Sequence, residues 1–352
     1  MKLKILFTFM AIMLVTSLVI AGCAAPAPAP TPAPAPTPAP APTPVPAPKP
    51  EPIELKAISC LRSDHSLVHW LHYMVEQVNE RAEGELTINY LGGPEVIDAF
   101  DQAEAIASGV VDVGYGITAY YTGTVPEAVT WLSRRESPAE EREVGLHDYM
   151  DQVHQEKLNA KYLGRSTWGA QFFLWLVPPV ETPDDLAGLK MRVAPAYAPW
   201  VEAVGAVPIS MPHSETFTAL ERGVVDGLNT PTASVHAHGY MEVVKYQIAH
   251  PAMRAEDNIL MNLDTWNKLP KHLQDLIMEI ELEIEARSAE WADGEEAVQI
   301  KEITEEYGVQ QIYFSADDAD RYVNAAYDAS WEKLAEVMDA ATISKLRTLM
   351  NS

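Results

Sequence analysis

The sequence predicts an α/β fold in two lobes, with a long helix near the C-terminus that bridges them. Short apolar runs typical of strands alternate with helical periodicity, a pattern that favours mainly parallel sheets. The 300 residues from 53 to 352 are long enough for two domains. Residues 269–307 carry a nearly unbroken helical pattern that would span about 50 Å, more than the width of a compact domain of this size.

The individual elements follow from periodicity and from turn and capping residues. We expect strands at residues 53–58, 85–91, 110–115, 160–166, 171–177, 190–194 and 309–314. We expect helices at residues 66–81, 96–108, 140–160, 199–204, 214–222, 269–307 and 315–339. Ser214 and Ser315 stand where N-caps are expected, and Gly294 is the point at which the long helix would break or bend.

The N-terminus predicts export from the cytoplasm. Lys2 and Lys4 precede an apolar run, which is the arrangement of a secretory signal peptide over residues 1–22. Small residues then lead to Cys23 in an order that resembles the bacterial lipobox, so we expect Cys23 to be lipidated and to hold the chain on the outer side of a membrane. The alternative is an uncleaved membrane anchor. The Pro- and Ala-rich segment that follows Cys23, up to residue 52, predicts an extended stalk.

Composition argues against several classes of function. The formal net charge is −25 at pH 7, and the sequence has neither a basic patch nor a Gly-rich phosphate loop, so we expect no nucleic-acid partner. The motifs HExxH and GxSxG and the Rossmann fingerprint are also absent from the sequence, so we expect a binding protein without a cofactor rather than an enzyme. Once Cys23 is lipidated, Cys60 has no disulfide partner and is expected to be buried.

Arg192 is the leading candidate for a functional residue. It lies in the apolar, strand-like run of residues 189–195, where an unpaired charge is costly. A guanidinium group matches a carboxylate in two parallel hydrogen bonds. One of the chain's many acidic side chains could be the partner, in a structural salt bridge. If the protein supplies no partner, the partner is an anionic ligand.

The tetrapeptide Gly-Val-Val-Asp occurs twice, at residues 109–112 and 223–226. Each copy follows a segment with helical periodicity and precedes an apolar run. We interpret the copies as matching helix-to-strand turns, one in each lobe, and we expect them to flank a single cleft.

A longer pattern surrounds Arg192 and the second tetrapeptide. It consists of GLKMR at residues 188–192, GAVP at 205–208, Ser-Glu at 214–215 and ALERGVVDG at 219–227. This pattern resembles the signature of the dicarboxylate-binding solute receptors of tripartite ATP-independent periplasmic (TRAP) transporters. The resemblance extends over the whole domain. It implies a periplasmic-binding-protein-like fold whose two lobes close on a small organic acid, with Arg192 gripping the carboxylate, and delivery of that acid to a TRAP-type membrane permease.

The resemblance also implies further positions in the ligand site. Gln171, shortly after Trp168, stands where some relatives have a second arginine and the oxo-acid receptors have glutamine, so one strong ion pair is expected. Asn229, followed by Thr230, replaces a glutamate that helps the oxo-acid receptors to bind sodium, so we expect no metal. His213 falls where some relatives stack an aromatic ring on the ligand; the alternative is a surface histidine. The predicted ligand-binding residues are Arg192, Gln171, Asn229, His213, Trp168, Thr230 and Tyr115.

Three histidines carry the main alternative. His65, His69 and His72 have a spacing compatible with metal ligation on one side of a helix, opposite an apolar stripe, and we expect them to face solvent or the start of the cleft. A divalent-metal receptor is therefore the alternative function, and a secreted enzyme is a weaker one. The aromatic rings of Trp168 and Tyr115 either wall the cleft or belong to the core.

These observations divide the chain into four parts. They are a lipoprotein signal peptide (1–22), a lipidated cysteine with its stalk (23–52), lobe I (53–168 plus 256–295) and lobe II (169–255 plus 296–352).

Overall fold

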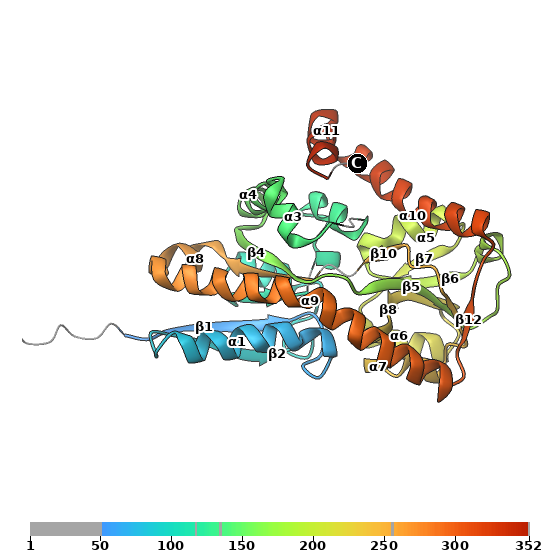
Figure 1. Cartoon of the computed structure of the whole chain (residues 1–352), viewed down its shortest axis with the longest axis horizontal. Helices are drawn as coiled ribbons and strands as arrows, with labels where there is room; N and C mark the ends of the chain where they lie inside the picture. Colours follow the sequence, from blue (N-terminus) through green and yellow to red (C-terminus); the bar gives the residue numbers. More distant parts are fainter. Residues whose placement is uncertain (1–50, 117, 134–135, 255–256, 351–352) are drawn as a thin grey trace, which may run out of the picture. The chain divides into compact units, whose positions relative to one another are not determined.

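The computed structural model describes residues 51–116, 118–133, 136–254 and 257–350. The predicted signal peptide, Cys23 and the predicted stalk up to residue 50 lie outside these ranges. Residues Pro50–Ser352 form one compact unit, which contains two β-sheets with helices packed around them (Figure 1). In the described ranges no helix has both the length and the apolar character that crossing a membrane requires.

The first sheet has five strands in the order β2-β1-β3-β11-β4. They are β1 (Ile53–Ser59), β2 (Leu86–Gly92), β3 (Val113–Tyr115), β4 (Ala160–Thr167) and β11 (Asp257–Asn262). Strand β1 pairs in parallel with β2 and β3, whereas β11 runs antiparallel to β3 and β4. The helices on this side are α1 (His69–Arg81), α2 (Gln102–Ala107), α3 (Pro138–Glu143), α4 (Leu146–Leu158) and α8 (Leu263–Lys268).

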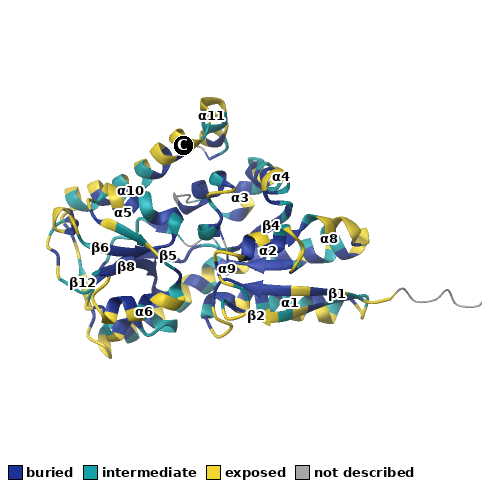
Figure 2. Ribbon diagram, turned by 180° about the vertical axis from the view of Figure 1, so that it is seen from behind, coloured by how far each residue is buried: buried dark blue, intermediate teal, exposed yellow. Residues whose placement is uncertain are grey.

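The second sheet has seven strands, six of them in the order β12-β9-β5-β8-β6-β7, and β10 pairs with β5. They are β5 (Gln171–Leu176), β6 (Lys190–Val193), β7 (Val207–Ser210), β8 (Gly227–Pro231), β9 (Tyr246–Ile248), β10 (Met253–Arg254) and β12 (Gln310–Ile312). The helices here are α5 (Ala198–Ala203), α6 (His213–Glu221), α7 (Thr232–Ala237) and α10 (Ala316–Val337). Helix α11 (Ala340–Leu349) follows α10 and reaches the first half, where Lys345 lies over the Tyr149 ring of α4. Figure 2 shows β5, β6 and β8 buried while the outer faces of the helices are exposed.

The prediction of mainly parallel sheets is wrong, because half of the strand pairings in the described chain are antiparallel. The chain leaves the first sheet through β4, enters the second as β5, and returns through β10 and β11. The outgoing pair of strands and the returning pair lie side by side, β4 with β11 and β5 with β10. In each pair one strand leads from the first sheet to the second and the other leads back, so the two strands are antiparallel. The alternation of strands and helices along the sequence does not show which strands become neighbours.

Two helix predictions also need correction. The helix expected over residues 140–160 is two helices, α3 and α4, separated at Gly145, whose φ of 80° is left-handed and favours glycine. The helix expected over residues 96–108 is only the short α2. The pattern for residues 66–81 is confirmed, with a first turn of 3₁₀ helix at Ser66–Val68 before α1.

Helix α9 (Lys271–Glu305) confirms the predicted long helix and continues through Gly294 without a break. It packs against α1 and β4 of the first sheet and against α7 of the second, so it joins the two halves of the unit (Figure 1). In the second half, His236 on α7 lies 3.0 Å from Glu302 of α9. The sequence ranges of the two sheets agree with the lobe boundaries proposed above, which stay a prediction.

The contact between α9 and β4 depends on two buried glutamates. Glu285 forms an ion pair with Arg142 at 2.8 Å, and Glu281 accepts a hydrogen bond from Ser166 at 2.9 Å. Between them Gly164 leaves the room they need, because a Cβ atom there would lie 2.2 Å from an oxygen of Glu285 and 2.6 Å from one of Glu281. A glycine on β4 therefore lets α9 approach the sheet closely.

Candidate functional site

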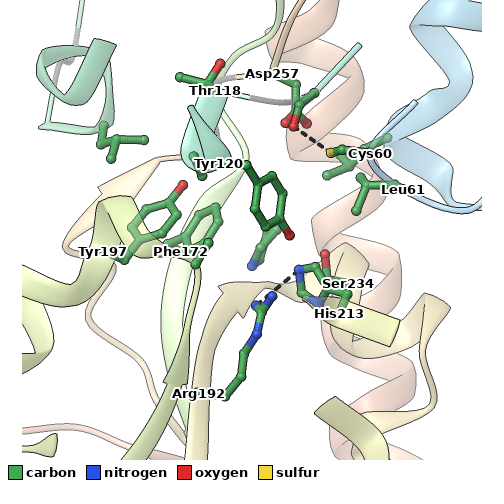
Figure 3. A pocket seen from close by; sticks show the side chains of 16 residues that line it. Cys60, Leu61, Thr118, Tyr120, Phe172, Arg192, Tyr197, His213, Ser234 and Asp257 are labelled. Atoms are coloured by element: carbon green, nitrogen blue, oxygen red, sulfur yellow. Dashed lines mark hydrogen bonds between the residues drawn. The ribbon is translucent and has the colours of Figure 1, made fainter. Parts of the chain in front are cut away.

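A pocket with about 490 Å³ of empty space, part of it open to solvent, lies at the edge of both sheets where β1, β3, β6 and β8 end. Its lining residues include Cys60, Leu61, Gly116, Thr118, Tyr120, Phe172, Arg192, Ala194, Tyr197, His213, Pro231, Ser234 and Asp257 (Figure 3). The carboxyl ends of strands are the usual place for ligands in α/β proteins.

Among the described residues that line this pocket, Arg192 is the only lysine or arginine. It lies on β6, is 1% exposed, and forms no ion pair with a carboxylate of any described residue. Its Nε donates to the Met211 carbonyl at 2.9 Å, and its Nη1 lies 3.3 Å from Nε2 of His213. Its Nη2 is buried and has no hydrogen-bond partner among the described residues. The structural salt bridge is thus not formed, and the guanidinium keeps a donor for another group.

His213 holds the Arg192 side chain in place. It is the first residue of α6, one residue before the predicted start, and its Nδ1 lies 3.0 Å from the Tyr240 hydroxyl. That hydroxyl donates to the His213 carbonyl, so Nδ1 donates to Tyr240 and Nε2 accepts from Arg192. Burial, and then the charge of Arg192, keep the pKa of His213 well below its usual value, so the ring is neutral. His213 lines the pocket, and its expected contact with the ligand stays a prediction.

A stack of histidine rings continues from His213. The ring of His238 lies 4.8 Å from that of His213 and 5.4 Å from that of His65. His65 is 2% exposed and lies 3.1 Å from the hydroxyl of Ser234, a lining residue, so of the two expected surroundings, solvent and the start of the cleft, His65 has the second. It precedes the helix and caps its first turn. The apolar stripe on α1 is buried as expected.

Aromatic side chains form the walls of the pocket. The rings of Phe172 and Tyr197 stack with centroids 4.3 Å apart. Tyr120 points its hydroxyl toward the end of the pocket that holds Arg192 and Ser234 (Figure 3). Burial raises the pKa of Tyr120 to about 12, so its hydroxyl keeps its proton and can donate to a ligand.

Tyr115 and Trp168 do not line the pocket. The Tyr115 side chain is fully buried in the first sheet, where its hydroxyl contacts the Leu67 carbonyl and the Thr167 hydroxyl. Trp168 lies between β4 and β5, with the Arg165 guanidinium 5.9 Å from the centre of its ring. Tyr115 belongs to the core in the form described, which was the other interpretation, whereas Trp168 is half-buried and its indole N–H has no hydrogen-bond partner among the described residues.

The three polar positions implied by the resemblance lie near the pocket rather than on it. Gln171 begins β5 and pairs with Arg254 of β10. Asn229 and Thr230 are fully buried on β8. Both amide atoms of Asn229 and the hydroxyl of Thr230 have no hydrogen-bond partner among the described residues. Of the predicted ligand-binding residues, the structure brings Arg192 and His213 together in the pocket lining. Gln171, Asn229 and Thr230 are not among the described lining residues.

The two Gly-Val-Val-Asp segments form the same turn, as predicted. Asp112 accepts a hydrogen bond from the Lys56 backbone at 2.9 Å, and Asp226 accepts one from the Lys190 backbone at 2.8 Å. Each segment begins with a glycine of positive φ. However, the turns precede β3 and β8, whereas the pocket lies where those strands end, so the expectation that they flank the cleft is wrong.

Several lining residues carried no sequence signal. Tyr120 and Asp257 lie just outside predicted elements, in stretches without periodicity, and Phe172 and Tyr197 are indistinguishable from core aromatics in the sequence. Their position after strand ends is the only hint. Cys60 was correctly expected to be buried, but it also lines the pocket, where its thiol donates to the Gly116 carbonyl at 2.6 Å.

The described ranges contain no group of three His, Cys, Asp or Glu side chains arranged to hold a metal ion. The ring nitrogens of His65 illustrate why: one accepts a hydrogen bond from the Leu67 backbone and the other contacts Ser234. The His72 ring likewise contacts the Ser63 carbonyl at 3.0 Å.

Sequence comparison now identifies the family. A sequence model described as bacterial extracellular solute-binding protein, family 7, matches residues 59–336. The chain belongs to this family. Membership confirms the prediction of an extracytoplasmic binding protein rather than an enzyme.

Individual relatives agree with this assignment. An uncharacterised protein of Haemophilus influenzae is 32% identical over 159 residues, which cover 44% of this chain and 48% of the relative. A TRAP periplasmic solute-binding protein of Desulfovibrio salexigens, solved with bound orotic acid, matches with a TM-score of 0.75 at 22% identity over 85% of this chain and 97% of that one. A Bordetella pertussis solute receptor that binds pyroglutamic acid matches with a TM-score of 0.75 at 15% identity over 85% and 99%.

The matches differ in the length they cover and in what they show. The chain spans about half the length of the curated relatives it matches. At the identities of the solved structures the likeness shows the fold, and it confirms the predicted α/β class of the TRAP solute-binding proteins.

Proposed function

We propose that this family 7 protein is an extracytoplasmic receptor that captures a small organic carboxylate in the described pocket and delivers it to a TRAP-type membrane permease. The observation that carries the proposal is Arg192, a buried guanidinium group that lines the pocket and has an unused donor and no acidic partner among the described residues. A buried unpaired charge is costly, and a carboxylate ligand would compensate it with charge-assisted hydrogen bonds.

Two further observations support a carboxylate. The solved structures with the same fold hold orotic acid and pyroglutamic acid, both of which carry a carboxyl group. Arg192 lies where the motif of the TRAP receptors has its carboxylate-binding arginine.

We assign the remaining roles by position. Arg192 binds the carboxylate, His213 orients Arg192, and Tyr120 donates a hydrogen bond to the ligand. In the ligand-bound form, closure of the proposed lobes would bring further groups to the pocket. We assign Asn229, Thr230 and Gln171 to these groups. The ligand would bind the closed form better and shift the population toward it, and the permease would bind the closed surface.

The proposed location follows from the N-terminus. Cleavage after residue 22 would leave a lipidated Cys23 on the membrane, and the Pro- and Ala-rich segment would act as the stalk. A Cys23→Ser substitution should release the protein from the membrane fraction. Retention of that variant in the membrane would contradict the lipid anchor.

A melting-temperature screen of the folded domain tests the function. It would compare monocarboxylates, dicarboxylates, oxo acids, sugar acids and, for the alternative, divalent metal ions. We expect at least one organic acid to raise the melting temperature of the wild type and to lose that effect in Arg192→Gln. A response to divalent metals alone, reversed by a chelator, would overturn the proposal in favour of a metal receptor.

A further inference from the structure

The pocket has a second polar end besides Arg192. Asp257 lines it from the start of β11 in the first sheet, whereas Arg192 lies on β6 in the second sheet. In Figure 3 the two side chains lie at opposite ends of the view, and Tyr120 lies between them. A ligand whose carboxylate is held by Arg192 therefore extends toward Asp257.

The protein itself does not use the Asp257 carboxyl group. It makes no hydrogen bond or ion pair with the described residues, and its Oδ2 atom is buried. The neighbouring Cys60 thiol donates to the Gly116 carbonyl instead. Burial raises the pKa of Asp257 to about 7. A buried carboxyl group without a partner destabilises the fold, so a structural role does not account for it.

The surroundings define what could reach Asp257. The Thr118 hydroxyl, which Figure 3 shows at the same end of the pocket, is also buried without a partner among the described residues. The stacked rings of Phe172 and Tyr197 form an apolar wall of the same pocket. A compact or cyclic ligand body fits such a wall, with polar groups at its two ends.

On the basis of the proposed function, we propose that Asp257 determines which organic acids bind. It accepts a hydrogen bond from an N–H or O–H group at the end of the ligand that is remote from the carboxylate, and it excludes ligands with a second carboxylate at that end. A donor satisfies the buried acceptor, whereas a second carboxylate would place two like charges together out of water. Among the described residues, Arg192 is the only lysine or arginine that lines the pocket, so no other described cation compensates the repulsion.

Two matched sets of acids test this by calorimetric titration of the folded domain. The first set is 4-hydroxybenzoate, 4-methoxybenzoate and terephthalate, which share a ring and a carboxylate and differ in the opposite group. The second is pyroglutamate, its lactone analogue with a ring oxygen in place of the N–H, and glutarate. In each set that binds, we expect the acid with the donor to bind the wild type at least tenfold more tightly than the other two.

The variant Asp257→Asn should reduce both differences by at least tenfold, because the amide carries no charge and can donate to a carboxylate as well as accept. Asp264→Asn is the matched control, since it removes the same charge from the exposed helix α8, outside the pocket lining. It should leave the ratios unchanged. A melting curve of each variant checks folding, and loss of the buried carboxyl group should not lower the melting temperature.

Two results would overturn the inference. One is a dicarboxylate that binds the wild type as tightly as the donor acid of its set. The other is an unchanged ratio in Asp257→Asn. If either occurs while Arg192→Gln abolishes binding, the role of Asp257 is refuted and the carboxylate receptor stands. If the acids bind Arg192→Gln as well as the wild type, or if none of the six binds the wild type, the proposed function fails as well.

Discussion

The substitution Arg192→Gln separates a ligand-binding arginine from a structural one. Arg192 and Arg165 are equally buried, each 1% exposed, so burial does not distinguish them. Arg165 forms an ion pair with Glu141 at 2.6 Å and donates to the Glu136 carbonyl at 2.6 Å. Arg192 has no acidic partner among the described residues and keeps a free Nη2 donor. The two positions are therefore a natural pair for comparison.

The expected loss of binding follows from the ion pair that the ligand would form. Removing one partner of a buried, hydrogen-bonded charge pair costs about 2–5 kcal/mol, which is about 30- to 5,000-fold in the dissociation constant. Arg192→Lys keeps the charge but loses the planar fork. It should cost roughly one charge-assisted hydrogen bond, about 1.5–3 kcal/mol or about 10- to 150-fold.

For the free energy of unfolding, we expect the smaller loss in Arg192→Gln and the larger loss in Arg165→Gln. Arg192→Gln loses the bonds to the Met211 carbonyl and to His213, each worth about 1 kcal/mol, but it also removes an unpaired buried charge, so the net change should be within about 2 kcal/mol. Arg165→Gln leaves Glu141 buried without its partner and should cost about 3–5 kcal/mol.

Calorimetric titration with the acid that gives the largest melting shift measures the first quantity, and denaturant unfolding of the ligand-free protein measures the second. We expect Arg192→Gln to lose binding and to remain stable, and Arg165→Gln to lose stability and, where folded, to bind with nearly unchanged affinity. The reasoning is refuted if Arg192→Gln binds as the wild type does, or if it unfolds as readily as Arg165→Gln.

Four further outcomes follow from the structure. His213→Phe removes the acceptor that orients Arg192 and should weaken acid binding about fivefold, since a hydrogen bond is worth about 1 kcal/mol, with partial recovery in His213→Gln; equal affinities would contradict it. Burial lowers the pKa of His238 to about 4, so its contribution to stability is complete above pH 6.5 and is lost as the pH falls toward 4. The melting temperature of His238→Gln should therefore fall less over that range than that of the wild type, and parallel pH profiles would speak against this. Gly164→Ala should reduce the free energy of unfolding by about 1–3 kcal/mol, because its Cβ meets the buried glutamates of α9. Gly294→Ala, on an exposed face of α9 with no atom within 4 Å of the new Cβ, should instead raise it by about 0.5–1 kcal/mol, which denaturant unfolding of both variants resolves.

The sequence predicted the parts of the fold that depend on local pattern. The long helix α9, the strand that carries Arg192 and the matching turns at Asp112 and Asp226 all follow from periodicity and turn residues. The antiparallel pairings could not be predicted in this way, because they depend on how the chain passes between the sheets at residues 168–170 and beyond Arg254.

The sequence indicated the site only through an unusually placed charged residue and through the resemblance to a known family. An arginine in an apolar run is unusual in any sequence, so Arg192 was recognisable, and His213 followed from the resemblance. Tyr120 and Asp257 reach the pocket from segments without periodicity, and their role depends on the packing of β3 and β11 side by side. Acidic residues are so numerous in this chain that one unpaired aspartate does not stand out.

The strand order has a consequence for how the chain is completed during synthesis. Strand β11 lies between β3 and β4, so β4 has no neighbour in the first sheet until residue 262 has been made. The second sheet lacks its edge strand β12 until residue 312. We therefore expect N-terminal fragments that stop short of β11 to remain unfolded. Such late completion would keep the chain extended for most of its synthesis, which is the form in which a polypeptide can be threaded across a membrane.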